Sequence, residues 1–463
     1  MNAREAAARL AGRRGRVLLD SASDADGLGR FSFAAAEPLA ELEARGRALV
    51  LRRGGEVAWR GEGDPLGALE QLAAEYGAQR AVGEGEPPTP VAIGWIGYET
   101  PVAGAWAPPS TAAGAGACSG AAAGAVAAAA AAPPLPDLWF GFYGAVYRHD
   151  EHGGRGEIAG CDPRARAALE QLLAAGPAAP GPLPLLGPLA PIDPTDGAYR
   201  RGFRAVADYL RAGDCYQVNL TRQLAAPVRR AGDPLALYRR LARRAPAPCG
   251  ALLEPGGGAA VLSASPERFL HRAPGGDRIE TRPIKGTRRR AGRPDLDARL
   301  AAELRSDDKE MAEHLMIVDL ERNDLGRVAR TGTVAVDSFA RVVALPTVLH
   351  LVSTVSCRVE PGLGTAALLA ASFPGGSITG APKRRAMEII AELEPAPRGV
   401  YTGALGYLGQ GGALDLAIAI RTAILAPDRL TLGVGGGLVA DSTLARELEE
   451  TEEKAAAWRA ALS

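Results

Sequence analysis

The sequence predicts an α+β fold in which large antiparallel β-sheets form a sandwich flanked by helices. Short apolar runs separated by Gly and Asp turns recur over residues 16–100, a pattern typical of antiparallel strands. From Tyr199 onward, strand pairs are mixed with separate helices, which favours an α+β fold over a parallel α/β fold. The chain has no phosphate-loop or dinucleotide glycine fingerprint. Its 463 residues are enough to bury a large core.

The first predicted region, residues 1–185, is rich in strands. We expect strands in RVLLD, RALVLRR, EVAWRG, VAIGWIGYE and LWFGFYGAVYRHD. Between the last two, an Ala/Gly-rich stretch near 104–136 is low in complexity and is expected to be a flexible insertion. The Pro/Gly-rich stretch 175–197 is expected to be a linker or surface crossing into a second region, residues 195–460.

The elements of the second region are predicted in the following order. YRRGFRAVADYLRAGDCYQVNLT predicts a helix that ends at Gly213 and a strand after it, and GALLEPGGGAAVLSASPERFL predicts a hairpin. RSDDKEMAEHLMIVDLERNDLGRV predicts a helix with Ser306 as its N-cap, and the apolar LMIVDL indicates that this helix is deeply buried. GALGYLGQGGALDLAIAIRTAIL predicts two strands joined by a turn, and DSTLARELEETEEKAAAWRAAL predicts a closing helix.

Composition excludes several classes of function. Basic and acidic residues number 53 each, so the balanced charge argues against a nucleic-acid binder. The five cysteines are scattered singly, which fits a reducing compartment. The N-terminus lacks an apolar signal core, and no segment has the length of strong hydrophobes that a membrane span needs. We therefore expect a cytoplasmic protein with no membrane partner.

Two helices carry carboxylates that are candidates for chemistry. In KEMAEH, Glu310 and Glu313 lie on one side of a helix; taken alone this is a solvated acidic face, but a buried helix makes such carboxylates costly unless a cation meets them. In RELEETEEK, Glu447, Glu450 and Lys454 form one stripe. The preceding GVGGGLVADS lets backbone N–H groups approach an anion, and glutamates from two helices with water would suit Mg²⁺.

Three further stretches are weaker or more ambiguous signals. The small residues and lysine that open FPGGSITGAPKRRAME make an anion site plausible. His350 lies in an apolar strand, where a histidine is more often a hydrogen-bonded core residue than a catalyst. Arg421 lies in LAIAIRTAIL, and because its charge cannot be neutralised it requires a carboxylate partner, which favours a functional role.

Together these segments resemble the chorismate-utilising enzymes, namely the large subunits of anthranilate and aminodeoxychorismate synthases, with isochorismate and salicylate synthases as relatives. The resemblance is dense over about 199–458, through DCYQVNLT, LSASPERFL, TRPIKGT, EHLMIVDLERNDLGRV, FPGGSITGAPKRRAMEII, YTGALGY, IAIRT and GVGGGLVADS. It implies that residues 195–460 form a chorismate-binding catalytic domain. It weakens toward the N-terminus, where LLDSASDADGLGRFSFAAAEP still looks like the family's opening strand pair.

The resemblance implies a role for each candidate side chain. Glu313 and Glu450 would hold Mg²⁺ against the ring carboxylate of chorismate, with Glu310 and Glu447 beside them as supporting or acid–base carboxylates. His350 would lie by the leaving 4-hydroxyl or the ring. The substrate would also meet Ser377, Tyr401, Arg421, Gly435, Gly436, Gly437 and Lys454. Of these, Tyr401 and Arg421 would bind the enolpyruvyl carboxylate, and Lys454 would neutralise surplus negative charge.

Within the family, Lys285 in ETRPIKGTRRR separates the activities. Anthranilate synthases usually carry a small residue there, whereas PIKGT looks like aminodeoxychorismate synthase. A neutral lysine amine can attack ring carbon 2 and expel the 4-hydroxyl, after which ammonia attacks carbon 4. Glu267 in SPERF resembles the general acid that assists loss of the hydroxyl. Arg282 and the cluster Arg288–Arg290 are expected to favour the neutral amine.

The resemblance therefore implies an aminodeoxychorismate synthase activity on the route to 4-aminobenzoate and folate, with Mg²⁺ as cofactor. No glutaminase motif is visible, so ammonia is expected from a glutamine amidotransferase partner. The alternatives are anthranilate synthase activity and a non-catalytic homologue that only binds chorismate or tryptophan. Family members hold tryptophan between the N-terminal strands and a central loop, which here would be lined by Ser21, Leu28, Gly29, Arg30, Phe31, Pro248, Cys249 and Gly250.

Overall fold

The computed structural model describes residues 1–23, 27–83, 85–102, 135–176 and 181–463. The Ala/Gly-rich insertion predicted near 104–136 lies almost wholly outside the described residues. Two antiparallel sheets of twelve strands each, with helices on their outer faces, confirm the α+β prediction. None of the helices in the described ranges is long and apolar enough to cross a membrane.

The closing helix of the chain packs on the first sheet. In spatial order its strands are β10 (Leu185–Leu186), β12 (Gln217–Arg230), β24 (Arg429–Leu438), β23 (Thr422–Leu425), β14 (Ala259–Ser265), β13 (Cys249–Gly256), β1 (Val17–Asp20), β2 (Phe31–Ala35), β8 (Val146–Asp150) and β9 (Arg155–Ala159), with β11 (Ala190–Pro191) and β20 (Gly380–Ala381) also paired to β12.

The second sheet contains the strand that carries Lys285. Its order is β17 (Ile284–Arg289), β19 (Val348–Arg358), β16 (Arg278–Arg282), β15 (Arg268–Arg272), β22 (Leu414–Ile418), β21 (Ala404–Gly409), β6 (Pro90–Ile96), β7 (Leu138–Phe142), β3 (Ala40–Arg45), β4 (Ala48–Arg53) and β5 (Glu56–Glu62), with β18 (Ala335–Ala344) also paired to β19. Both sheets mix the two predicted regions, since β1 pairs with β13 and β6 with β21.

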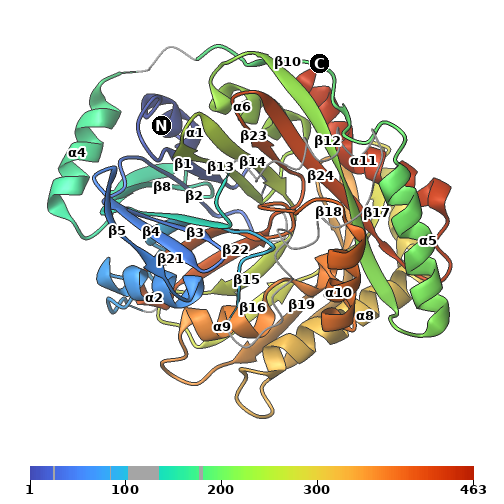
Figure 1. Cartoon of the computed structure of the whole chain (residues 1–463). Coiled ribbons are helices and arrows are strands. Elements are labelled where there is room, and N and C mark those ends of the chain that lie inside the picture. The colour runs from blue at the N-terminus through green and yellow to red at the C-terminus, as the bar shows by residue number, and fades with distance from the viewer. Residues whose placement is uncertain (24–26, 84, 103–134, 177–180) are drawn as a thin grey trace.

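Helices cover the outer face of each sheet. Those over the first sheet are α1 (Ala3–Arg9), α4 (Pro163–Ala174), α6 (Pro234–Arg244) and α11 (Leu444–Leu462). Those packed with the second sheet are α2 (Pro65–Glu75), α8 (Asp308–Gly326) and α9 (Thr365–Ser372), whereas α10 (Lys383–Leu393) packs on β12 and β20 of the first sheet. Helix α5 (Gly197–Ala212) lies against β12, and α7 (Pro294–Ser306) precedes α8. Figure 1 shows α5 and α11 beside β12 and β24, on the opposite side of the molecule from α4.

Alternation along the strands builds the core between the sheets. In β1, Val17 and Leu19 face the second sheet while Leu18 faces the helices, so the strand is buried on both sides. Phe33 of the first sheet meets Tyr407 of the second edge to face, with ring centroids 5.3 Å apart. This apolar layer fixes the sheets against each other and so fixes the position of side chains at their shared edges.

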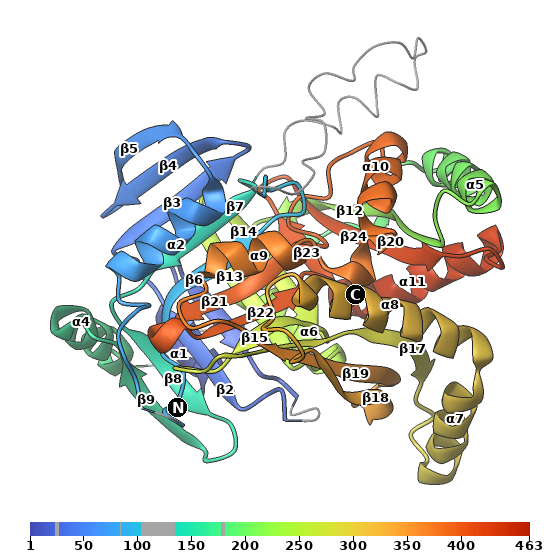
Figure 2. The ribbon, with the colours of Figure 1, turned by 90° about the horizontal axis from the view of Figure 1, so that it is seen from below.

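Helix α8 corrects two sequence expectations. Its N-cap is Asp307, whose carboxylate accepts the N–H of Glu310 at 3.1 Å, and not Ser306, which ends α7 and donates to the carbonyl of Glu303. The helix is also not deeply buried, because Leu315 is 57% exposed. Figure 2 shows α8 running along β17 and β19 with one side uncovered. Only the inner face of the helix therefore meets the sheet.

Candidate functional site

Two crossings of the chain between the sheets place the centre of the site. The chain passes from β14 to β15 through Glu267, and from β22 to β23 through Arg421. The crossings are bonded to each other: Ile418 donates its N–H to the Glu267 carbonyl at 3.0 Å, and Ala264 donates to the Arg421 carbonyl at 3.2 Å. Arg421 has a φ of 53°, a conformation that non-glycine residues adopt at a cost and that is common at functional sites.

The glycines of β24 form the floor of the site, because other side chains occupy the space where theirs would be. A Cβ at Gly436 would lie 3.0 Å from Oε2 of Glu447 and 3.2 Å from Oε1 of Glu450. A Cβ at Gly437 would lie 2.9 Å from Nζ of Lys285. Because β24 has no side chains at these two positions, the carboxylates of α11 and the amine of β17 can lie close to its backbone.

The inner stripe of α11 faces this floor, as its spacing predicted. Lys454 donates to the Gly435 carbonyl at 2.6 Å and pairs with Glu450 at 2.6 Å. Burial acts to raise the pKa of Glu450, but the ammonium groups of Lys454, Lys285 and Lys309 together more than offset it, and the pKa lies below its ordinary value. Glu447 is buried, and its pKa is raised by that burial and by the Glu450 charge.

Helix α8 brings its two candidate carboxylates to different surroundings. Glu313 faces the site: burial raises its pKa, the Glu310 and Glu450 charges add to this, and Lys285 and Lys309 act in the opposite direction. Glu310 instead accepts a hydrogen bond from Arg288 at 3.0 Å, and this ion pair ties the start of α8 to β17. Glu313 is therefore the α8 carboxylate that shares the electrostatic environment of Glu450.

Lys285 lies among carboxylates and not among the arginines that surround it in sequence. Arg288 is held by Asp307 at 2.7 Å as well as by Glu310, Arg290 by Asp297 at 2.9 Å, and Arg282 by Glu280 at 2.6 Å. The Lys285 charge instead acts to lower the pKa of three glutamates, namely Glu267, Glu313 and Glu450. For Arg282, Arg288 and Arg290 this geometry removes the argument that the arginines favour a neutral amine, because each of these guanidinium groups is neutralised by its own partner.

Glu267 is buried at the crossing beside Lys285, with 5% of its surface exposed. Its carboxylate accepts hydrogen bonds from the Ser377 hydroxyl and from the backbone N–H of Ile284. Burial raises the pKa of Glu267 to about 7, and these bonds and the Lys285 charge only partly offset that effect. A carboxyl group that titrates near neutral pH suits proton transfer in either direction.

His350 lies on β19 opposite Thr287 of β17, two residues from Lys285. Its Nδ1 is 3.0 Å from the Thr287 hydroxyl and 3.4 Å from the Gly286 carbonyl. Burial and the Arg421 charge lower the pKa of His350 to about 4, so the ring is neutral at physiological pH. With Nδ1 engaged by these groups, Nε2 is the ring nitrogen left for other contacts.

Arg421 and Tyr401 are brought together at the other end of the site. Arg421 donates to the Lys454 carbonyl at 3.1 Å, and across the described ranges no carboxylate comes within ion-pair distance of it. Burial lowers the pKa of Arg421, while the Tyr401 hydroxyl and the Glu450 charge act to raise it. The Tyr401 ring packs on Gly433 of β24, where a Cβ would lie 2.2 Å from it. A half-buried guanidinium without a carboxylate partner is suited to bind an anion.

Two carboxylates of α11 converge at Gly436. Oε2 of Glu447 is buried without a hydrogen-bond partner, and it converges with Glu450 on the same glycine. Of the residues that the structure describes, no group of three or more His, Cys, Asp or Glu side chains is placed to hold a metal. A Mg²⁺ ion at Glu313 and Glu450 would take the rest of its shell from water and substrate, as this ion commonly does. The magnesium site stays a prediction.

Two side chains have roles that the sequence did not indicate. Gln217 of β12 is fully buried, neither its amide oxygen nor its amide nitrogen has a partner, and its Nε2 lies 2.9 Å from a Cβ at Gly437. In the sequence, Gln217 was marked only by its position within the motif DCYQVNLT. Lys383 does not contribute to the anion site predicted for FPGGSITGAPKRRAME, because its ammonium is bound by Asp324 and by the carbonyls of Ser372 and Pro374.

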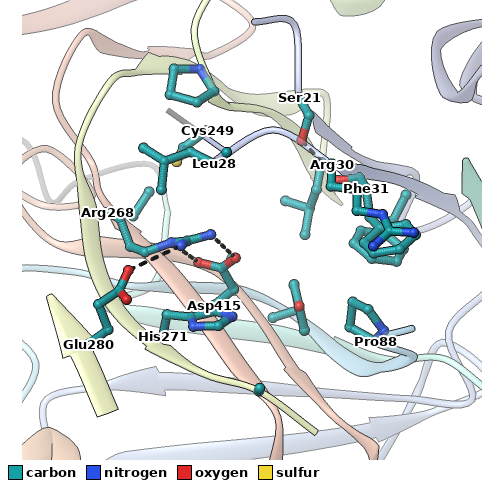
Figure 3. A pocket seen from close by; sticks show the side chains of 18 of the residues that line it. Ser21, Leu28, Arg30, Phe31, Pro88, Cys249, Arg268, His271, Glu280 and Asp415 are labelled. Carbon is teal, nitrogen blue, oxygen red and sulfur yellow. Dashed lines mark hydrogen bonds and ion pairs between the residues drawn. The ribbon is translucent and has the colours of Figure 1, made fainter. Parts of the chain in front are cut away.

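A separate cavity of about 440 Å³ lies next to the site, between the two sheets (Figure 3). All the residues expected to surround tryptophan line it except Gly29. Sequence reasoning missed its charged wall, in which Arg268 binds Asp415 at 2.8 Å and Glu280 at 3.6 Å. A cavity of about 20 Å³ shares Leu28 with it and reaches His350. Tryptophan binding stays a prediction.

Comparisons with known proteins agree with this arrangement. A family model described as chorismate binding enzyme matches residues 27–460. Aminodeoxychorismate synthase component 1 of Klebsiella aerogenes is 49% identical over 256 residues, 55% of this chain and 56% of that protein. Anthranilate synthase component 1 of Streptomyces coelicolor is 45% identical over 268 residues, 58% of this chain and 52% of that protein. The matched part thus spans about half the length of these curated relatives.

Solved structures match over nearly the whole chain. Anthranilate synthase component I from Streptococcus pneumoniae superposes with a TM-score of 0.75 at 30% identity, over 93% of this chain and 92% of that one. The menaquinone-specific isochorismate synthase MenF of Escherichia coli superposes with a TM-score of 0.72 at 16% identity, over 100% of this chain and 92% of that one. The second likeness is one of fold alone.

Proposed function

This chain belongs to the family of chorismate binding enzymes, and from that premise we propose that it is component I of an aminodeoxychorismate synthase. The observation that carries the proposal is the position of Lys285, whose amine lies over Gly437 next to the buried acid Glu267. The similarity to curated aminodeoxychorismate synthases supports it. The product would be 4-amino-4-deoxychorismate, a precursor of 4-aminobenzoate and folate.

Chorismate would bind across the floor of glycines. Arg421 would pair with the enolpyruvyl carboxylate, because no carboxylate of the described residues lies within ion-pair distance of it and Tyr401 lies beside it. The ring carboxylate would lie toward Glu313 and Glu450, where Mg²⁺ would screen the negative charges and polarise the substrate. Lys454, held at the Gly435 carbonyl, adds a fixed positive charge to this end.

The first chemical step would form a bond between Lys285 and ring carbon 2. Only the neutral amine can attack, so a proton of its ammonium form would first pass to the adjacent Glu267 carboxylate. As Nζ bonds to carbon 2, the ring double bond shifts and the bond from carbon 4 to its hydroxyl breaks. Glu267, with a pKa of about 7, is able to protonate that hydroxyl so that it leaves as water. Neutral His350 would lie by the same hydroxyl without adding charge.

The second step would reverse the allylic shift with a different nucleophile. Ammonia attacks carbon 4, the double bond returns, and the bond from carbon 2 to Lys285 breaks. The proton that ammonia loses compensates the one that the departing amine takes up, and Glu267 is the group suited to transfer it. The unpartnered amide of Gln217, next to Gly437, is placed to hydrogen-bond ammonia or the amine. A glutamine amidotransferase subunit would supply the ammonia.

Product identification tests the proposal. The protein is incubated with chorismate, Mg²⁺ and an ammonium salt, and the products are followed by mass and fluorescence with and without an added aminodeoxychorismate lyase. We expect a non-fluorescent product that yields 4-aminobenzoate only with the lyase. Fluorescent anthranilate formed without lyase would instead establish anthranilate synthase activity. That second candidate is favoured by the similarity to curated and solved anthranilate synthases.

We also propose that the large cavity binds tryptophan. Its volume of about 440 Å³ and its apolar wall suit an indole, and its buried ion pairs offer polar partners for an amino acid. Calorimetric titration with L-tryptophan tests this. We expect binding that is weakened when Ser21, whose hydroxyl donates to the Phe31 carbonyl at 2.9 Å, is replaced by a bulky residue. An absence of heat with the wild-type protein would refute the proposal.

A further inference from the structure

A buried acid on α8 lies behind the catalytic side chains and has no part in the steps above. Glu321 is 3% exposed, on the inner face of the helix that also carries Glu313. Its Oε1 accepts the backbone N–H of Gly376 at 2.9 Å. Its Oε2 is buried and finds no hydrogen-bond partner among the residues that the structure describes. A buried carboxyl oxygen without a partner is costly, so its retention in this position calls for an explanation.

The bond from Glu321 reaches the turn that orients Glu267. Gly376 begins the 3₁₀ turn Gly376–Ile378, and the next residue, Ser377, donates its hydroxyl to the Glu267 carboxylate. The turn is held from the other side by Asn219, whose amide donates to the Ser377 carbonyl at 3.3 Å. Contact between Glu321 and Gly376 is close, since a Cβ at 376 would lie 3.0 Å from Oε1. A movement of Glu321 would therefore move the hydroxyl that orients Glu267.

The charges around Glu321 favour its neutral form. Burial and the neighbouring Asp324 charge raise the pKa of Glu321 to about 8, and the Glu267 charge acts in the same direction. Lys383 and the Gly376 N–H act to lower it, but Lys383 is already bound to Asp324. As a neutral acid, Glu321 accepts the Gly376 N–H without placing a second negative charge behind Glu267.

We propose that Glu321 is a positioning residue which, while protonated, holds the Gly376–Ser377 turn and thereby keeps Glu267 in its reactive orientation and ionisation state. This inference rests on the proposed role of Glu267 in chorismate chemistry and goes beyond it. Ionisation of Glu321 would place a negative charge near Glu267. The acid would then give up its proton less readily.

Two substitutions separate position from charge. Glu321→Gln keeps an oxygen for the Gly376 N–H and is neutral at every pH, whereas Glu321→Leu removes the acceptor. Each variant is assayed for consumption of chorismate with ammonium and Mg²⁺ from about pH 6 to about pH 9. We expect Glu321→Leu to lower kcat by about tenfold to a hundredfold with little change in KM, as when supporting hydrogen bonds are lost elsewhere. Glu321→Gln should retain kcat at neutral pH within about twofold and lose the inflexion near pH 8.

Thermal unfolding supplies a readout that does not require activity. An acid whose folded pKa is about 8 and whose ordinary value is 4.5 destabilises the fold progressively as the pH rises between those values. The melting temperature of Glu321→Gln should therefore rise relative to the wild type over this range. The control is Glu41→Gln on β3, which removes a buried carboxylate that is paired with Arg14 and belongs to none of the groups proposed to act on chorismate. Burial raises the pKa of Glu41 as well, so this variant should also gain melting temperature as the pH rises, but it should leave the pH dependence of kcat unchanged.

Specific results would overturn the proposal. A wild-type kcat in Glu321→Leu would exclude a positioning role. A folded Glu321→Gln as defective as Glu321→Leu, or one that keeps the inflexion near pH 8, would exclude the requirement for a neutral acid. If Glu321→Leu does not fold, the profile of Glu321→Gln decides. The assay measures consumption of chorismate, so the identity of the product does not affect it. Formation of anthranilate would therefore refute the proposed product and not the role of Glu321. If the wild type shows no turnover, the melting temperatures of the variants decide whether Glu321 is held in its neutral form.

Discussion

A single methyl group at Gly437 should disable the site without unfolding the protein. The backbone of Gly437 is not in the left-handed region, so Gly437→Ala adds no backbone strain. The new Cβ would lie 2.9 Å from both Lys285 Nζ and Gln217 Nε2, whereas ordinary contacts begin at 3.4 Å. Both groups are the ends of flexible side chains and must retreat by about 0.5 Å or more. Such misplacement of a reacting amine should lower kcat by about tenfold to a hundredfold.

The assay is product formation by mass at saturating chorismate and ammonium, together with thermal unfolding of each variant. The matched control is Gly326→Ala at the end of α8, where a Cβ would have no heavy atom within 4 Å. The control should leave kcat unchanged, and Gly437→Ala should melt close to the wild type. A Gly437→Ala protein with kcat within about twofold of the wild type would refute the view that Lys285 reacts from its position over β24.

Three further outcomes are expected. Lys285→Ala should abolish formation of aminodeoxychorismate by mass spectrometry, and an unchanged yield would exclude a covalent role for the amine. Glu267 has a pKa of about 7 against an ordinary 4.5, so its protonated form is favoured by folding and stability is lost as the pH rises between these values. In urea unfolding, the free energy of unfolding of Glu267→Gln should rise relative to that of the wild type by up to about 3 kcal/mol between pH 4.5 and about pH 8. A difference between the two proteins that does not change with pH would contradict the raised pKa. Glu450→Gln should raise the half-saturating Mg²⁺ concentration by about tenfold or more, through loss of one charged ligand; an unchanged Mg²⁺ dependence would exclude it as a ligand.

Both parts of the sequence contribute strands to both sheets, and this arrangement determines where the site lies. Strands of the first 185 residues and of the later residues pair with each other in both sheets, as in β1 with β13 and β6 with β21. The apolar layer between the sheets therefore draws on both parts of the sequence. Because the tryptophan-sized cavity lies in that layer and the small cavity beside it reaches His350, the layer connects the two candidate sites.

Local elements could be predicted from the sequence because their signals are local. The helix before Gly213 ends at Ala212 with Gly213 in the left-handed region, and the hairpin of β13 and β14 forms at its glycines. The cap of α8 was predicted one residue too early, because Ser306 and Asp307 are both good caps and the preceding helix uses Ser306 in its last turn. The depth of α8 was also misjudged, because an apolar run does not reveal which of its side chains a sheet will cover.

The sequence by itself indicated the α+β class, many of the helices and strands in their order, the run of glycines, and the residues able to carry acid, base and amine chemistry, since these follow from residue type and short-range spacing. It did not show that GALGYLGQGGALDLAIAIRTAIL forms three strands, because the third belongs to the other sheet. Only the tertiary structure decided what each group faces. The two crossings between sheets bring Glu267 to Ser377, and the packing of β17 over β24 brings Lys285 to Gly437. The arginines next to Lys285 in sequence are neutralised by α7, α8 and β16 instead. Charge acts through space, so the environment of a reactive group depends on sheet register and packing, which neighbours in the chain do not reveal.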